Sequence, residues 1–348
     1  MQKLPDELII IILENINLKD LLNFKLVNKQ FSNFIKKVKW NKSLVIDKKN
    51  HIDIDEFLKN HKFNIIQINN YPDIKETAKY LCDSQEIILI NSYINIKYWK
   101  YLASCRSINY YSMSNMNKKH AYIFNDMKLE TLELIVLSGI YREFFENLNL
   151  KYLKSFIVKG NSFELCKKIV FSSQLPNLEE LTIKSGDLIS NEILDIISNN
   201  FKKLKKLDIS HLSYCTSNLN QLVNLKNLTN LSINGNDTTL DDESILYLSS
   251  LVGLTDLNLK CYKFNIKSSY LYLSNLENCC FYKIKKGILK FLEFPKLKSL
   301  ELDSSSLESF ENLSFPLLEK LIIKNIKISR EIKLFINHLK LKYLDIKI

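Results

Sequence analysis

The residue types that carry out most enzyme chemistry are present in this sequence, but they do not form a catalytic pattern. Neither a glycine-rich phosphate loop nor the motifs His-Glu-x-x-His and Gly-x-Ser-x-Gly occur, and there are only six glycines. The acidic pairs Glu179-Glu180 and Asp241-Asp242 fit the exposed edge of a strand and the start of a helix better than a catalytic acid and base. The five histidines are far apart in the sequence: His51, His61, His120, His211 and His338. We therefore expect a chain that binds and does not catalyse, with no cofactor.

The cysteines also argue against a metal site or a disulfide framework. There are seven, an odd number, with no Cys-x-x-Cys pair and no matching histidine spacing. We expect them to be reduced and to behave as small hydrophobic residues. At the N-terminus, Asp6 and Glu7 precede the apolar run Leu8 to Leu13, which is too short to span a membrane and does not fit a signal peptide. These features predict a protein of the cytoplasm or the nucleus.

The charge of the chain does not indicate a nucleic-acid partner. The formal net charge is +11, but only Arg106, Arg142 and Arg330 are arginines, and the lysines are scattered among acids. Nucleic-acid-binding surfaces usually have clustered basic residues, often interleaved with aromatic ones. A solvated, lysine-rich surface explains this charge better than a phosphate-binding face.

A short pattern recurs along most of the chain: an anchor, two variable residues, an apolar residue, one variable residue and a second apolar residue. The spacing of the anchors falls within the range of about 20 to 29 residues that is typical of leucine-rich repeats. The clear copies begin at Leu178, Leu204, Leu228, Leu254, Leu297, Leu318 and Leu341. Weaker copies begin at Asn41, Phe63, Ser84, Cys105, Leu129, Leu153 and Leu276.

The pattern predicts one strand in each repeat. In a strand, the fourth and sixth residues of the unit share one face and the third, fifth and seventh share the other, so the first set fills the core and the second set is exposed. The segments Ser190 to Phe201 and Asp241 to Leu251 have helical spacing, with Asn191 and Asp241 as plausible caps. Strand-then-helix units of this length stack into a solenoid with a parallel sheet inside and helices or irregular segments outside. The region resembles a leucine-rich-repeat domain, an α/β fold.

The exposed face of this sheet is where we expect a target protein to bind. Its mixture of positive and negative side chains suits a protein or peptide partner better than a polyanion. One less polar group on this face is either a binding hot spot or the packing of an irregular repeat: Asn278, Cys280 and Tyr282. A second group is either an apolar patch or a local register error: Ile65, Ile88 and Ile90. The candidate target-binding residues are Glu180, Thr182, Lys184, Lys206, Asp208, Asn230, Asn234, Asp256, Asn258, Lys260, Cys280, Tyr282, Glu301 and Lys320.

The first 40 residues have a different pattern, which predicts three short helices. Pro5 suits a first helical position, and the residues from Leu8 to Leu13 are apolar nearly all round the first helix. A second helix restarts at Leu21, and apolar residues at helical spacing between Phe31 and Val38 mark a third. A segment this short cannot bury a core of its own, so either the rest of the chain or a partner must cover it.

This segment resembles an F-box. The resemblance covers residues 4 to 40 and rests on Leu-Pro-x-Glu-Leu, Ile-Leu, x-Asp-Leu-Leu, Val-Asn-Lys-x-Phe and a closing Trp. Phe31 stands where many members of the family have Trp, which keeps an apolar contact. The family implies docking onto a Skp-type adaptor, and through it onto a cullin with a RING subunit. The implied contacts are Leu4, Pro5, Leu8, Ile12, Leu21, Leu22, Val27 and Phe31.

Together these patterns predict an F-box at residues 1–40 and a leucine-rich-repeat solenoid at 41–348, with weaker repeats at 41–128 and clearer ones at 129–348. The function that the resemblance implies is a non-catalytic, substrate-recognising adaptor of a Skp-cullin-F-box ubiquitin ligase. Two alternatives remain open. The F-box could bind the Skp adaptor without promoting ubiquitination, or the chain could be a repeat scaffold whose helical segment only caps the array. We expect neither a nucleic acid nor a membrane as partner.

Overall fold

The structure is a computed structural model of the whole chain. It describes residues 39–47, 58–59, 62–71, 74, 76–111, 116–136, 142–160, 174–189, 191–212, 216–282, 291–303, 315–326 and 330–347. The predicted F-box helices, and with them the residues expected to contact the adaptor, lie outside this set. The chain divides into two compact units, unit 1 (Met1–Leu153) and unit 2 (Lys154–Ile348).

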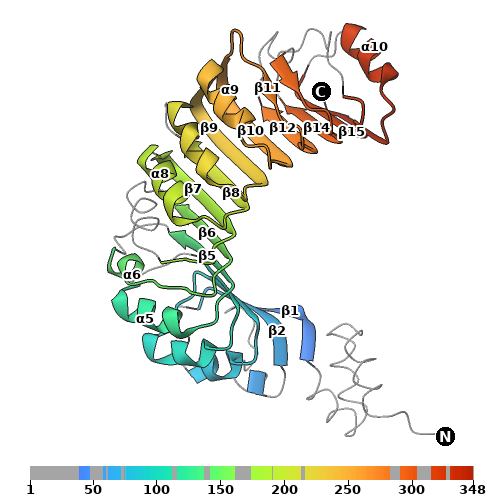
Figure 1. Cartoon of the computed structure of the whole chain (residues 1–348). Coiled ribbons are helices and arrows are strands. Elements are labelled where there is room, and N and C mark those ends of the chain that lie inside the picture. The colour runs from blue at the N-terminus through green and yellow to red at the C-terminus, as the bar shows by residue number, and fades with distance from the viewer. Residues whose placement is uncertain are drawn as a thin grey trace, which may run out of the picture. The chain divides into compact units, whose positions relative to one another are not determined.

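Unit 1 contains a parallel sheet whose strands pair in sequence order (Figure 1). Short helices follow the strands, and two of those described are 3-10 helices. The strands are β1 (Lys39–Asp47), β2 (Lys62–Asn69), β3 (Glu86–Ile90), β4 (Ser107–Tyr111) and β5 (Thr131–Val136). The helices are η1 (Glu76–Leu81), η2 (Ile96–Leu102), α5 (Lys118–Asp126) and α6 (Arg142–Glu146).

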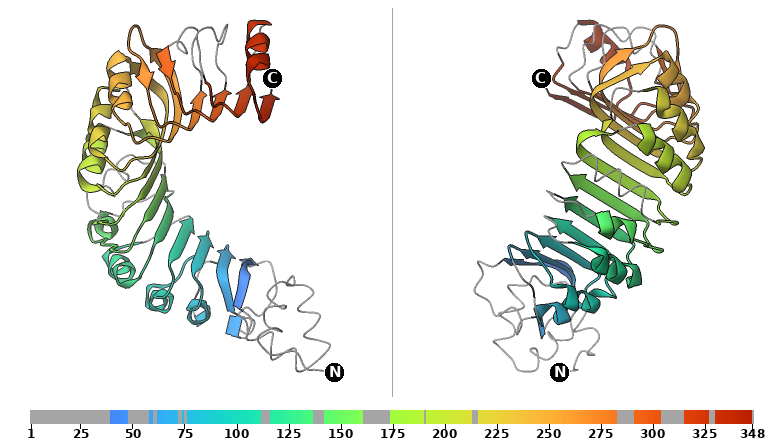
Figure 2. Two further views of the ribbon diagram at one scale, coloured as in Figure 1. Left: turned by 45° about the vertical axis from the view of Figure 1, so that its right-hand side comes forward. Right: turned by 90° about the vertical axis from the view of Figure 1, so that its left-hand side faces the viewer.

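Unit 2 repeats the same arrangement with a longer parallel sheet. Its strands, in spatial order, are β6 (Ser155–Gly160), β7 (Glu180–Ile189), β8 (Lys206–Leu212), β9 (Asn230–Asp241), β10 (Asp256–Asn265), β12 (Asn278–Tyr282), β14 (Ser299–Asp303), β15 (Lys320–Lys324) and β16 (Tyr343–Lys347). A separate parallel pair is formed by β11 (Leu271–Tyr272) and β13 (Leu292–Glu293). The helices are α8 (Asn191–Asn200), η3 (Thr216–Asn224), α9 (Asp242–Ser249) and α10 (Arg330–His338). Helices α8 and α9 cover one face of the sheet (Figures 1 and 2).

The repeat pattern of the sequence is confirmed strand by strand. Each predicted repeat contributes one strand, including the weaker repeats that begin at Phe63, Ser84 and Cys105. The fourth and sixth residues are buried as expected; in β9, for example, Leu231 and Ile233 are 2% and 1% exposed. The residues between and around them are partly exposed. The predicted helices at 190–201 and 241–251 are α8 and α9.

Backbone hydrogen bonds explain why the anchor leucines fix the register. The amide of Leu204 donates to the carbonyl of Phe201 at 3.0 Å, which closes a tight turn before β8. The next amide, that of Lys205, donates to the carbonyl of Glu179 in the preceding repeat at 2.8 Å. The same two bonds recur from repeat to repeat, for example at Leu228 and Leu254. Each strand therefore starts at the same level as its neighbour.

The expected burial is wrong at β16. Leu344 and Ile346 occupy the fourth and sixth positions of their repeat but are 44% and 39% exposed. Among the described residues β16 pairs with β15 and with no later strand, so these side chains are covered by a neighbouring repeat on one side only.

Candidate interaction surface on the exposed sheet face

Strand pairing in unit 2 aligns the outward-facing residues into three rows that cross the strands. The first row is Ser155, Glu180, Lys206, Asn230, Asp256, Asn278, Ser299, Lys320 and Tyr343. The second row is Ile157, Thr182, Asp208, Ser232, Asn258, Cys280, Glu301, Ile322 and Asp345. The third row includes Lys159, Lys184, Asn234, Lys260, Tyr282, Asp303, Lys324 and Lys347. All the candidate target-binding residues fall in these rows.

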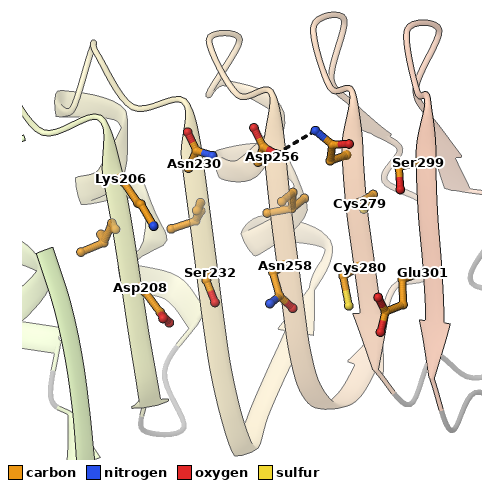
Figure 3. A pocket seen from close by; sticks show the side chains of 14 residues that line it. Lys206, Asp208, Asn230, Ser232, Asp256, Asn258, Cys279, Cys280, Ser299 and Glu301 are labelled. Carbon is orange, nitrogen blue, oxygen red and sulfur yellow. Dashed lines mark hydrogen bonds between the residues drawn. The ribbon is translucent and has the colours of Figure 1, made fainter. Parts of the chain in front are cut away.

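Part of this face is a hollow of about 340 Å³ over strands β8 to β14 (Figure 3). We call it the hollow. Its polar lining contains seven of the candidates: Lys206, Asp208, Asn230, Asp256, Asn258, Cys280 and Glu301. The other candidates lie on the same face outside it: Glu180, Thr182, Lys184, Asn234, Lys260, Tyr282 and Lys320. Ser232, Asn278 and Ser299 also line the hollow. The alternation of the strands predicts all three on the exposed face, and Asn278 belongs to the candidate hot spot with Cys280 and Tyr282.

The three acids of the hollow differ in how their charge is compensated. Asp208 lies 3.6 Å from the Nζ of Lys184, and Glu301 lies 2.7 Å from the Nζ of Lys324. Asp256 instead accepts hydrogen bonds from the Nδ2 of Asn278 at 2.8 Å and from the Oγ1 of Thr255 at 2.7 Å. Both donors are neutral. Within the described part of the chain, Asp256 is therefore the one acid of the hollow without an ionic partner.

The middle of the second row is neutral and incompletely hydrogen-bonded. The Oδ1 of Asn258 is out of contact with solvent and has no hydrogen-bond partner among the described residues. Next to it, burial and the nearby carboxylate of Glu301 raise the pKa of the Cys280 thiol to about 11, against smaller opposing effects of Lys260 and Lys324. A thiol with this pKa stays protonated at neutral pH and is a poor nucleophile. The hollow is therefore equipped to bind by hydrogen bonds and charge.

The exposed sheet face of unit 1 has a different character. Ile90, Tyr111 and Ile135 are direct neighbours across β3, β4 and β5, and Ile88 lies two residues before Ile90 on the same face. All four are half-buried, and the strand pairing around them is regular. The regular pairing shows that the register error is wrong. The apolar interpretation holds around Ile90, whereas Ile65 pairs with Ser43 and Glu86 and lies outside this group.

The described residues show no alternative site for metal or thiol chemistry. They contain no group of three or more His, Cys, Asp or Glu side chains that could hold a metal ion. Cys82, Cys105, Cys279 and Cys280 are free, and burial raises the pKa of the Cys105 thiol to about 12. Over the same part of the chain, the helices are too short or too polar to cross a membrane.

Comparisons with known proteins agree with both parts of the chain. Residues 1–43 match the F-box domain. A leucine-rich-repeat protein of Leptospira interrogans is 17% identical, with 92% of each chain covered and a TM-score of 0.51. An internalin (InlF) of Listeria monocytogenes is 16% identical, with 90% of this chain and 88% of that chain covered and a TM-score of 0.46. TLR13, solved in complex with single-stranded RNA, is 14% identical with a TM-score of 0.44, and this chain covers 59% of its length. No curated protein sequence matches.

The likeness to the Leptospira protein, together with the stacked parallel strands, defines a leucine-rich-repeat solenoid. The chain therefore combines an F-box domain at residues 1–43 with a leucine-rich-repeat fold. This combination supports a protein-interaction adaptor.

Proposed function

We propose that the chain is the substrate-recognition subunit of a Skp-cullin-F-box type ubiquitin ligase. The F-box would dock onto a Skp-type adaptor, and the exposed sheet face of the repeats would hold the target. The observation that carries this proposal is the F-box match at residues 1–43 followed by a repeat fold with a broad polar face. The proposal also places the protein in the cytoplasm or the nucleus.

The mechanism is an increase in effective concentration. One chain that binds both the ligase core and the target turns ubiquitin transfer from a bimolecular encounter into a local one. The chain itself supplies no catalytic group in this proposal. The geometry of the bound target decides which of its lysines is modified.

Adaptor docking is tested by substitutions in the F-box. The double change Leu4→Ala with Pro5→Ala, or the single change Phe31→Asp, should weaken capture of a purified Skp-type adaptor by about 30-fold or more, because hot-spot residues contribute about 2 kcal/mol or more. The measurement is affinity by calorimetry on the full chain, with circular dichroism to show that the repeats stay folded. Lys36→Asp, on the polar side of the predicted third helix, is the matched control and should bind normally. Unchanged capture of the adaptor by Phe31→Asp would show that the assigned contacts are wrong.

Reconstitution separates a ligase subunit from an F-box protein without ligase function. The chain is combined with the Skp-type adaptor, a cullin, its RING subunit and ubiquitin-charging enzymes. The proposal expects one complex that contains the cullin and transfers ubiquitin to a protein tethered on the repeat face. A complex with the adaptor that excludes the cullin would favour the non-ligase alternative.

A further inference from the structure

We propose that the hollow binds a short extended segment of the target that carries a lysine or an arginine. The cationic side chain would bind the carboxylate of Asp256, and the segment's backbone would hydrogen-bond to the carboxamide of Asn258. This inference rests on the proposed function, since it specifies the chemistry of the target segment.

The charge of the hollow differs in sign from that of the chain. The full sequence has a formal charge of +11, whereas the lining contains one lysine, Lys206, and the three acids Asp208, Asp256 and Glu301, which gives 1 − 3 = −2. Two of these acids already contact lysines of the third row, but Asp256 contacts neutral donors alone. A cation that binds Asp256 therefore gains a charge-assisted hydrogen bond without displacing an existing ion pair. An acidic segment would be repelled at the same point.

The unsatisfied carboxamide of Asn258 explains how the backbone of the segment could be held. A buried acceptor without a donor destabilises the free protein. Rotation of the carboxamide about its terminal side-chain bond would turn Oδ1 toward the hollow, where a peptide N–H supplies the missing donor and Nδ2 can donate to the adjacent carbonyl. These hydrogen bonds would recognise the backbone of the segment and would not depend on the side chains of the target.

The positions of the two residues suit one segment. Asp256 and Asn258 are two residues apart on β10, so their side chains point to the same face about 7 Å apart (Figure 3). Ser232 lies next to Asn258 on β9, and Ser299 lines the hollow on β14, two strands from β10; both add hydroxyl groups that can donate or accept. The volume of about 340 Å³ is near the lower end of ligand pockets, which span about 300–1,000 Å³. It fits one long side chain with a few backbone groups.

The test uses the full chain, without the adaptor, to select from a display library of random twelve-residue peptides. Wild-type protein should enrich peptides with lysine or arginine by about threefold or more over the input library. Asp256→Asn, which keeps the shape of the side chain, should lose this preference. Glu293→Gln is the matched control, because Glu293 is an exposed acid on β13 outside the three rows and outside the hollow, and it should keep the preference.

A double-mutant cycle then assigns the contact. The best peptide and its citrulline or glutamine counterpart are measured against wild type and Asp256→Asn. The basic peptide should bind Asp256→Asn about tenfold more weakly, a loss that corresponds to about 1.4 kcal/mol, and the neutral peptide should not distinguish the two proteins. No enrichment, an enrichment of acidic peptides, or a basic preference that survives in Asp256→Asn would overturn the proposal.

These outcomes are separate from those of the proposed function. Peptide selection does not involve the F-box, and adaptor capture does not involve the hollow. If the chain does not bind the adaptor but still selects basic peptides, the proposed ligase function is wrong and the hollow remains a binding site. Normal adaptor binding without a basic preference would remove this inference alone.

Discussion

Asn258 is a residue at which stability and binding impose opposite requirements. Its Oδ1 has no hydrogen-bond partner and no contact with solvent, so the free protein loses stability there. Asn258→Leu removes the unsatisfied acceptor, and we expect the free energy of unfolding to stay unchanged or to rise by up to about 1 kcal/mol, while selection of extended peptides weakens. Chemical denaturation and peptide binding measure the two effects.

Asn230→Leu is the control for this prediction. The Oδ1 of Asn230 accepts a hydrogen bond from the Oγ1 of Thr229 at 2.7 Å, so its loss should lower stability by about 0.5–1 kcal/mol. A comparable loss of stability in both variants would show that the acceptor of Asn258 is satisfied in solution.

The start of α9 illustrates the element scale, because one carboxylate joins two successive repeats. Asp242 lies in the first turn of α9 and accepts hydrogen bonds from the backbone amides of Lys267, Ser268 and Ser269 at 2.7–3.2 Å. These amides lower its pKa from 3.8 to about 2. A lowered pKa favours the folded state wherever the carboxylate is ionised. That contribution is fully present above about pH 4 and is lost as the pH falls toward 2.

We therefore expect Asp242→Asn to lower stability at pH 7 and to flatten the fall in stability between pH 4 and pH 2. Urea denaturation across that pH range measures both effects. Asp126→Asn, an exposed acid at the end of α5, should leave the pH profile as in wild type. An unchanged acid dependence in Asp242→Asn would assign the acid sensitivity to other carboxylates.

The strands were predictable from the sequence because their signal is local and repeated. Alternation such as Leu207-x-Ile209 specifies a buried face, and the anchor turn specifies where each strand begins. The 3-10 helices η1, η2 and η3 lack a sustained period of 3.6, and α5 depends on a capping box between Asn117 and His120 that is not the usual Ser/Thr with Glu/Gln pair. These elements are determined by tertiary packing more than by their own pattern.

The candidate surface was predictable in part. Alternation identified the outward residues, and most of the hollow's polar lining was among the candidates. The hollow itself was not predicted, because it depends on short side chains such as Ser232 and Cys280 lying on either side of Asn258 in the second row. Likewise, the sequence does not show that Asp256 lacks an ionic partner, because Lys260 follows it on β10 and Lys206 lies in the same row. The register of the strands determines that neither lysine pairs with it.

At the scale of the whole molecule, each repeat is stabilised chiefly by its neighbours, as in other solenoids. In unit 1 the core includes an aromatic cluster in which the ring of Phe124 lies 4.9 Å from that of Trp99 and 5.6 Å from that of Phe144. Phe124→Ala should lower local stability by about 3–5 kcal/mol. We expect faster hydrogen exchange in β4, β5 and α5, with protection in β8 to β10 of unit 2 retained.

Tyr122→Ala is the control for this prediction. Tyr122 lies on the same helix but is 53% exposed, so its removal should change exchange little. An equal loss of protection throughout both units after Phe124→Ala would indicate that the chain unfolds as a single cooperative body.

The raised pKa of Cys280 has a consequence for the redox behaviour of the hollow. Peroxide and similar oxidants attack the thiolate, and a thiol with a pKa of about 11 offers almost none at cellular pH. Cys280 should therefore resist conversion to sulfenic acid, although it lines a surface that a partner can reach. The hollow would then keep the same hydrogen-bonding groups under oxidative stress.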